Sequence, residues 1–260
     1  MLTPEISILT LLIIGFIIFD FILETILDTL NAKTWDIPIP KELEGIYDEE
    51  KYAKAKKYHQ ATQRISTLST IISTVLTIAV LWWKGFAFVH IYITQFTLSP
   101  ILQAVLFFGV FAVASSIIGL PFELYSIFVI EEKFGFNKMT WKTYIADKIK
   151  GYILGALIGG ILLSLFVWFY TITGTLFWIY AWVVFSVFTI FFAMFYTSII
   201  VPIFNKLNPL EEGALREKIE LFAKKINFPL TNIFVIDGSK RSTKANAYFS
   251  GLGNKKTIVL

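Results

Sequence analysis

The sequence offers few residues that could bind a catalytic metal ion. It has two histidines, His59 and His90, and no cysteine. A catalytic zinc ion usually takes three protein ligands and keeps a fourth position open for water or substrate. No His-Glu-x-x-His motif occurs, so we expect no catalytic residue and no metal site in this chain. The lack of cysteine also excludes a disulfide and a thiolate nucleophile.

Carboxylates within apolar runs are the next candidates for chemistry. Asp20 and Glu24 lie four residues apart, on one face of a helix, and Glu123 lies close to Pro121. A carboxylate in hydrocarbon costs about 2.5–3.5 kcal/mol on insertion scales, so such residues commonly have a function. Two interpretations stay open for them. They line a water-filled cavity, or they lie at a span end and reach the polar interface.

A short basic cluster, Ser239 to Ser242, could bind a phosphate or a nucleic acid. An exposed loop between two strands would have the same composition. The residues alone do not decide between these two interpretations.

The elements that position these residues are mostly membrane spans. The composition is 56% hydrophobic and 16% charged, against roughly 45–50% apolar and about 25% charged in soluble domains. The net charge of +4 does not indicate a nucleic-acid partner, because the basic residues are confined to segments between apolar runs. We therefore expect the lipid bilayer, and no nucleic acid, as a partner.

Five apolar runs are long enough to cross about 30 Å of hydrocarbon, which takes about 20 helical residues. Several end in tryptophan or tyrosine, which are enriched at membrane interfaces. Pro121 lies late in the third run, where it should kink the helix or help to end it. The predicted spans are residues 6–27, 65–83, 101–125, 152–170 and 178–201.

The distribution of lysine and arginine predicts the orientation of the spans. Twenty-two of the 23 basic residues lie on one side if five spans alternate, and only Lys84 lies on the other. Short cytoplasmic loops carry an excess of Lys and Arg. We therefore expect the N-terminus outside and the C-terminus in the cytoplasm, with His59 and His90 on opposite sides of the membrane.

The chain changes character after Pro202. Apolar residues at three- and four-residue steps from Glu211 to Asn227 predict an amphipathic helix. Strands are predicted over Asn232 to Ile236, over Ala245 to Ser250, and from Lys256 onward. Residues 202–260 thus predict the start of a cytoplasmic α+β domain after an all-α membrane domain, residues 1–201. The chain ends inside the third strand, which we expect to be unpaired, and we interpret this as a sign of truncation.

Two longer runs resemble the type I CAAX prenyl protease family. The first is LPFELYSIFVIEEKFGFN, from Leu120 to Asn137, followed by Asp147 and Lys150. The second is DGSKRSTKANAYFSGLG, from Asp237 to Gly253. The segments Pro202–Leu210 and Tyr47–Tyr58 agree in kind, so the resemblance covers essentially the whole chain.

The resemblance implies a multi-span zinc metalloendopeptidase of the gluzincin type that cleaves near the C-terminus of prenylated peptides. It also implies that residues 202–260 begin a metalloprotease domain and that this chain stops before the His-Glu-x-x-His motif. Zinc is therefore implied for the complete enzyme and not for these 260 residues. By the family's Asn-Ala-Tyr-Phe motif, Asn246, Ala247 and Tyr248 are implied substrate-binding residues. The alternating pattern from Lys244 to Ser250 places Ala247 and Phe249 on the opposite face from Asn246, so we expect Phe249 to pack inward.

The alternative function is a non-catalytic membrane scaffold or accessory protein that keeps the same fold. A transporter is disfavoured, because no span carries a paired charge or a break between two apolar halves. For location we expect a multi-pass protein, with a prokaryotic plasma membrane preferred over an endoplasmic reticulum.

The orientation can be tested with reporter fusions. Fusions after Lys150 and after Lys206 should report the cytoplasm, and a fusion after Gly85 should report the outside. The reason is the excess of basic residues on one side of the five spans. A cytoplasmic signal at Gly85 would rule out the arrangement of five spans.

Overall fold

The structure is a computed structural model that describes residues 7–35, 48–253 and 256–260. It forms two compact units, Met1–Gly135 and Phe136–Leu260. The predicted boundary at residue 201 is a change in composition, and it falls inside the second unit. That boundary between membrane part and peptidase part stays a prediction.

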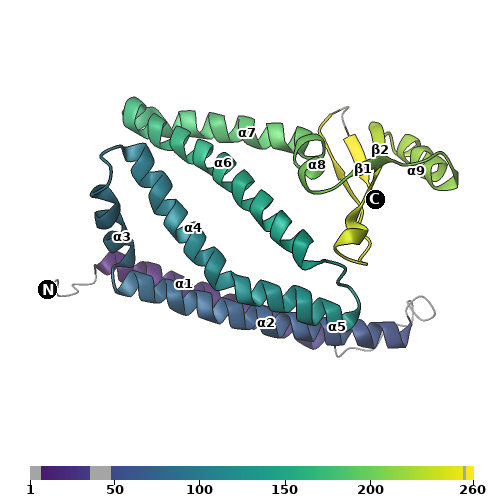
Figure 1. Cartoon of the computed structure of the whole chain (residues 1–260), viewed down its shortest axis with the longest axis horizontal. Coiled ribbons are helices and arrows are strands. Elements are labelled where there is room, and N and C mark those ends of the chain that lie inside the picture. The colour runs from purple at the N-terminus through teal and green to yellow at the C-terminus, as the bar shows by residue number, and fades with distance from the viewer. Residues whose placement is uncertain (1–6, 36–47, 254–255) are drawn as a thin grey trace. The chain divides into compact units, whose positions relative to one another are not determined.

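The first unit is helical throughout its described residues. Helices α1 and α2 lie side by side, and the short helix α3 leads from the end of α2 to α4 (Figure 1). The elements are α1 (Ile8–Thr34), α2 (Glu49–Trp82), α3 (Gly85–Thr94), α4 (Pro100–Tyr125), the π-helix η2 (Ser126–Glu131) and α5 (Glu132–Phe134).

Polar side chains fix where these long helices begin. The Asp48 carboxylate accepts hydrogen bonds from the backbone N–H groups of Glu50, at 2.9 Å, and Lys51, at 3.2 Å. Ser99 accepts in the same way at the start of α4, where Pro100 occupies the first turn. Such caps satisfy N–H groups that have no partner inside the helix.

Pro121 does not end its helix. Helix α4 continues through it to Tyr125 and passes directly into η2. The π-helix and α5 pack on α2: the Tyr58 hydroxyl donates to Glu131 Oε1 at 3.2 Å, and its ring meets that of Phe134 edge-on at 5.3 Å. The third predicted span therefore extends beyond Tyr125 into a segment that is held against α2.

The second unit begins with a helical hairpin. Helix α6 (Trp141–Thr173) and helix α7 (Phe177–Ile199) pack together and are joined by the 3₁₀ turn η3 (Gly174–Leu176) (Figure 1). Gly174 has φ +56°, a left-handed conformation that glycine adopts without steric cost. The short helix α8 (Val201–Phe204) follows α7 and leads into the sheet.

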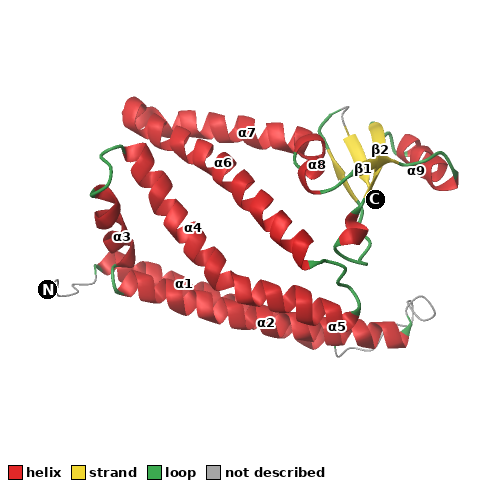
Figure 2. Ribbon diagram, viewed as in Figure 1, coloured by secondary structure: helices red, strands yellow, loops and turns green. Residues whose placement is uncertain are grey.

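The sheet has four strands in the order β1-β2-β4-β3 (Figure 2). The strands are β1 (Leu207–Pro209), β2 (Leu230–Ile236), β3 (Tyr248–Ser250) and β4 (Lys256–Val259). Strands β2 and β4 are parallel, and the outer pairs are antiparallel. The three predicted strands are present, and β1 was not predicted.

The prediction that the last strand is unpaired is wrong. Strand β4 lies between β2 and β3 and pairs with both. Its residue Val259 is fully buried, and Ile233 of β2 is 3% exposed. The parallel pairing of β2 with β4 was not predicted, because β3 lies between these two strands in the sequence. The periodicity of a strand does not say which strands become its neighbours in the sheet.

The predicted amphipathic helix is present as α9 (Ala214–Lys225). Ala223 is buried, but Leu221 and Phe222 are 68% and 63% exposed. The helix therefore has the predicted type, while much of its apolar side chain area is uncovered in this chain.

Four described helical stretches are long and apolar enough to cross a membrane: Ile8–Thr34, Glu49–Trp82, Pro100–Phe134 and Trp141–Phe204. The fourth contains both α6 and α7, so five long helices correspond to the five predicted spans. Helix α3 is a further, short apolar helix where only a loop was predicted. The fold class, a membrane-type helical bundle followed by a small α+β region, is confirmed.

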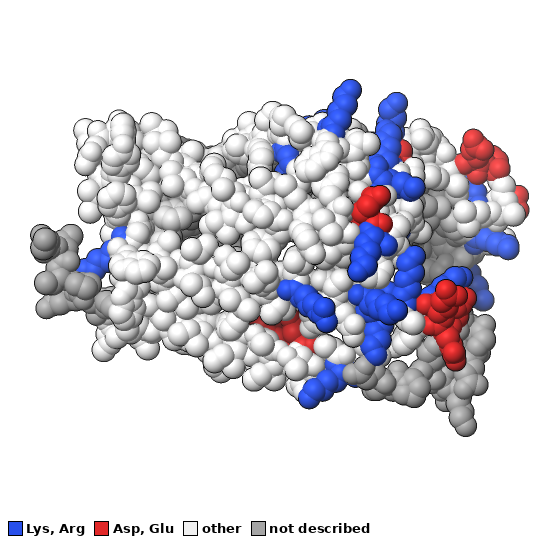
Figure 3. Space-filling model, turned by 60° about the horizontal axis from the view of Figure 1, so that its bottom comes forward, with Lys and Arg blue, Asp and Glu red and all other residues white. Residues whose placement is uncertain are grey.

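The surface agrees with burial in lipid. Charged side chains are unevenly distributed over the surface, and wide areas carry none (Figure 3). Large apolar side chains such as Ile8, Phe16 and Trp182 are 68–79% exposed. Hydrocarbon would cover these side chains as a protein core covers those of a soluble protein.

The sheet core can be tested by shortening one buried side chain. Ile233→Ala should cost about 2–5 kcal/mol, because it leaves a cavity between β2 and β4. Val235→Ala in the same strand is the control, because Val235 is 38% exposed. Amide hydrogen exchange of residues 230–236 in detergent measures both variants. Equal exchange rates in the two variants would contradict the assigned core.

Candidate functional site

Strand β3 lies at the edge of the sheet and is attached to the end of α7. Thr197 of α7 forms a hydrogen bond with Ser250 of β3. The backbone N–H of Gly251 donates to the carbonyl of Ala193 at 3.2 Å. The strand therefore has β4 on one side, and its position is fixed against the membrane hairpin.

The three predicted substrate-binding residues lie at the start of this edge strand. Tyr248 is the first residue of β3 and is half-buried, and burial raises the pKa of its hydroxyl. Asn246 and Ala247 precede the strand and are exposed. The Asn246 side chain accepts a hydrogen bond from the N–H of Ala247 at 2.9 Å.

The expectation that Phe249 packs inward is wrong. Its side chain is 64% exposed, and its ring meets that of Phe228 edge-on at 5.7 Å. Successive side chains of a strand point to opposite faces. Because Ser250 points to α7 and Tyr248 shares its face, Phe249 points the other way, where α7 does not cover it.

Arg241 connects the loop before β3 to the helices of the second unit. Its Nε and Nη2 donate to the two oxygens of Asp147, at 2.6 and 2.9 Å. Nη1 donates to the Asn205 side chain, and Nη2 also donates to the carbonyl of Phe204 at 2.8 Å. The bonds to Asp147 raise the pKa of Arg241. A planar guanidinium suits this two-pronged arrangement.

Asp237 fixes the beginning of the same loop. Its carboxylate accepts the N–H of Lys206 at 2.8 Å and pairs with Lys240. The hydrogen bond from Lys240 is the main reason that the pKa of Asp237 is lowered. The loop is therefore attached to the residue that precedes β1.

Backbone contacts fix the end of the loop. The N–H of Lys138 donates to the carbonyl of Arg241, and the N–H of Thr243 donates to that of Phe136, both at 3.0 Å. An isolated bridge pairs Asn137 with Ser242. Because the loop on one side and β3 on the other are both anchored, the exposed segment with Asn246 has fixed ends.

The basic cluster lies in the loop between β2 and β3, where Ser239 and Lys240 are exposed and Arg241 is not. Arg241 is committed to Asp147, and its side chain is only 21% exposed. It is a structural residue rather than an anion ligand. The sequence did contain both residues, since Asp147 follows the first run that resembles the family and Arg241 lies in the second. Ninety-four residues separate them, so sequence spacing could not pair them.

The described residues do not offer a zinc site. No group of three or more His, Asp or Glu side chains gathers among them in a way that could hold a metal. His59 stacks on Trp35, with ring centroids 4.9 Å apart, near the start of α2. His90 lies on α3, which follows the far end of α2. We assign no zinc ligand within the described residues.

Comparison with known families identifies the chain. The family model described as "CAAX prenyl protease N-terminal, five membrane helices" matches residues 28–206. The model of peptidase family M48 matches residues 209–260. The chain belongs to the CAAX prenyl protease family. The resemblance carried by the runs from Leu120 and from Asp237 is thereby confirmed.

Individual relatives agree with the family assignment. The chain is 37% identical over 229 residues to the CAAX prenyl protease 1 homolog of Mus musculus, covering 85% of this chain and 48% of the relative. It is 34% identical to the Arabidopsis thaliana homolog, covering 95% of this chain and 60% of the relative. The crystal structure of S. mikatae Ste24p matches with a TM-score of 0.88 and 36% identity, covering 98% of this chain and 61% of that one.

The chain thus spans about half to three fifths of the length of these CAAX prenyl proteases. Its apolar helices and its relatives show that it is an integral membrane protein. The comparisons place no catalytic residue on this chain. The roles of Asn246, Ala247 and Tyr248 therefore stay predictions.

The Arg241 cluster can be tested by two substitutions at that position. Arg241→Gln leaves the half-buried Asp147 carboxylate without its ion pair and should cost about 1.5–3 kcal/mol. Arg241→Lys keeps the charge but loses the two-pronged geometry, so its cost should be smaller. Limited proteolysis of residues 237–247 at several temperatures measures the loss of order.

Glu212→Gln is the matched control. It removes an ion pair with Arg216 in which the Glu212 side chain is 85% exposed, and exposed pairs contribute about 0–1 kcal/mol. If Arg241→Gln and Glu212→Gln have the same effect, Arg241 does not hold the loop.

Proposed function

We propose that this chain is the N-terminal membrane part of a CAAX-type zinc metalloendopeptidase. In the complete enzyme it would act near the C-terminus of prenylated peptides or of membrane proteins. The family match over residues 28–206 and 209–260 is the observation that carries this proposal. The contribution that we assign to this chain is to bind and orient the substrate. Among its described residues no group of three or more His, Asp or Glu side chains could hold a metal.

The edge strand is the proposed binding element. Strand β3 has a single strand neighbour, β4, so its outer edge can accept an extended peptide by strand addition. Such an edge provides main-chain N–H and C=O groups, which recognise the backbone of a peptide rather than its sequence. Sequence preference must then come from side chains beside the strand.

Asn246 is the side chain that we assign to this task. Its amide can donate to a peptide carbonyl and accept from a peptide N–H. In the structure the oxygen takes the N–H of Ala247, and the side chain is exposed. The amide nitrogen therefore points a donor toward solvent, beside the strand edge. Tyr248 supports the strand against α7 and fixes where this donor lies.

The proposal also includes the orientation and the location of the protein. The orientation with the N-terminus outside and the C-terminal tail in the cytoplasm is part of the proposal, supported by the basic residues. The reported relatives are eukaryotic, so they give no support to a prokaryotic plasma membrane. The partners we propose are the lipid bilayer and a peptide substrate.

The proposal can be tested with the polypeptide as the cell makes it, including any residues that follow Leu260. Purified protein should release a short peptide from the C-terminus of a farnesylated CAAX peptide. Chelation of zinc should stop the reaction, and added zinc should restore it. A stable protein that binds the peptide and never cleaves it would support the scaffold alternative instead.

The role of Asn246 generates a second prediction. Asn246→Ala should lower kcat/KM by roughly two- to tenfold, the effect of losing one hydrogen bond of about 0.5–1.5 kcal/mol. The melting temperature should hardly change, because Asn246 is exposed and its side chain bonds, among the described residues, to the adjacent Ala247. Val259→Ala in the fully buried centre of the sheet should instead lower the melting temperature. Unchanged turnover in Asn246→Ala would remove Asn246 from the binding element.

A further inference from the structure

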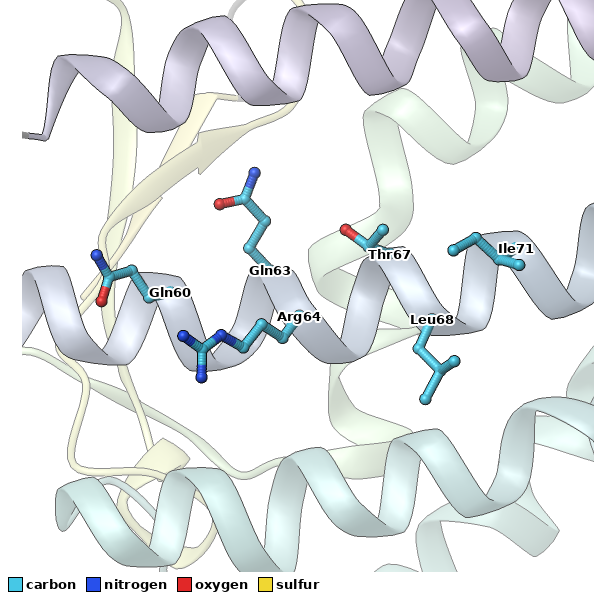
Figure 4. Close-up of a pocket in the computed structure, with 6 residues that line it drawn as sticks. All are labelled: Gln60, Gln63, Arg64, Thr67, Leu68 and Ile71. Carbon is cyan, nitrogen blue, oxygen red and sulfur yellow. The ribbon is translucent and has the colours of Figure 1, made fainter.

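The first unit contains a pocket of its own. Its volume is about 430 Å³, within the range of roughly 300–1,000 Å³ that is typical of ligand sites. All of its lining residues belong to α2 (Figure 4): Gln60, Gln63, Arg64, Thr67, Leu68 and Ile71.

The spacing of these residues places them on one face of α2. They follow one another at steps of three, one, three, one and three residues, which makes a continuous stripe on a helix. Helix α2 packs against α1 and also against α4 and η2. Gln63 points toward α1, and Leu68 points the opposite way (Figure 4). The stripe therefore lies between neighbouring helices.

The pocket crosses the edge of the hydrocarbon layer. Trp82 ends α2 and is of the type that settles at a membrane interface. Arg64 lies 18 residues before it, or about 27 Å along the helix axis, which is close to the thickness of the hydrocarbon core. Arg64 is therefore at headgroup depth when Trp82 is at the opposite interface. Leu68 and Ile71 are deeper by about 6 and 10 Å.

The chemistry of the lining changes with this depth. The outer half carries two amides and a guanidinium, and the inner half carries Leu68 and Ile71. The Arg64 side chain extends back toward Gln60 and away from the hydrocarbon (Figure 4), as long cationic side chains do near an interface. In the part of the chain that the structure describes, Arg64 is exposed and makes no hydrogen bond or ion pair.

The described carboxylates of the neighbouring helix α1 form no ion pair with Arg64. The contact from α1 is made by the main chain, since Gln63 Nε2 donates to the carbonyl of Asp28 at 3.1 Å. This bond occupies the Gln63 nitrogen and leaves its side-chain oxygen as an acceptor. Gln60 and Arg64 are the other lining residues that carry N–H donors.

We propose that this pocket binds an anionic glycerophospholipid. Arg64 and the Gln60 amide donate to the lipid phosphate, and the Gln63 oxygen accepts from a hydroxyl or ammonium of the headgroup. Thr67 lies at the depth of the ester groups, and an acyl chain follows Leu68 and Ile71. A small soluble anion would use the outer half and leave the apolar half in contact with water.

The test is lipid binding to the purified protein in detergent, followed by native mass spectrometry. Dioleoyl phosphatidic acid should bind more tightly than dioleoyl phosphatidylcholine, which has the same acyl chains. Arg64→Gln should weaken the binding of phosphatidic acid by about fivefold, the usual contribution of one cation near an anionic headgroup. Arg64→Lys should keep most of the affinity.

Two further variants separate a lipid site from a simple anion site. Leu68→Trp should fill the apolar half and lower the affinity for phosphatidic acid, with the melting temperature as the check of folding. Lys51→Gln is the control, because Lys51 lies 13 residues before Arg64, about 20 Å along α2, beyond the screening length of about 10 Å.

Three results would overturn the proposal: equal binding of the two lipids, no effect of Arg64→Gln, or binding of inorganic phosphate as tight as that of phosphatidic acid. None of these readouts depends on peptide cleavage.

Discussion

The architecture depends on the need to satisfy every backbone N–H and C=O group inside hydrocarbon. Water is absent there, so an unpaired group costs several kcal/mol, and helices are the way for a single segment to avoid this cost. Helices α1, α2, α4, α6 and α7 take up the apolar part of the chain for this reason. Among the described residues, all four strands, including the edge strand with open main-chain groups, lie beyond Ile200, where water or a peptide can satisfy these groups.

A charged cluster attaches the sheet to the end of the helical hairpin. The sheet is small, and Ile233 and Val259 are its most deeply buried apolar residues. Such a core does little to fix the sheet against a pair of long helices. Arg241 supplies that attachment through Asp147 of α6 and through Asn205 and Phe204 beyond α7. The positions of β3 and of the exposed Asn246 segment then follow from this cluster and from the bonds of Thr197 and Ala193.

The sequence was sufficient for features that depend on local composition. Five apolar runs, the amphipathic helix α9 and three strands could all be predicted from hydropathy and periodicity. The order of the strands could not, because β4 is inserted between β2 and β3 by tertiary packing. Phe249 was placed on the wrong face for a related reason: alternation gives two faces but does not say which one α7 covers. The Arg241–Asp147 pair joins residues too far apart in the chain for any local pattern to connect them. The family motifs located the region of the candidate site without revealing this support.

The π-helix η2 affects how this family's sequences should be aligned. A π-helical turn amounts to an α-helix with one residue inserted, and one residue turns everything beyond it by about 100°. The faces that present Glu131 and Phe134 to Tyr58 depend on that added residue. A homologous sequence that lacks one residue between Ser126 and Glu131 would keep the same hydropathy profile and the same number of spans. It would nevertheless bring a different set of side chains to α2. If the alignment placed the gap elsewhere, residues that face α2 in one protein would be aligned with residues that face away from it in the other.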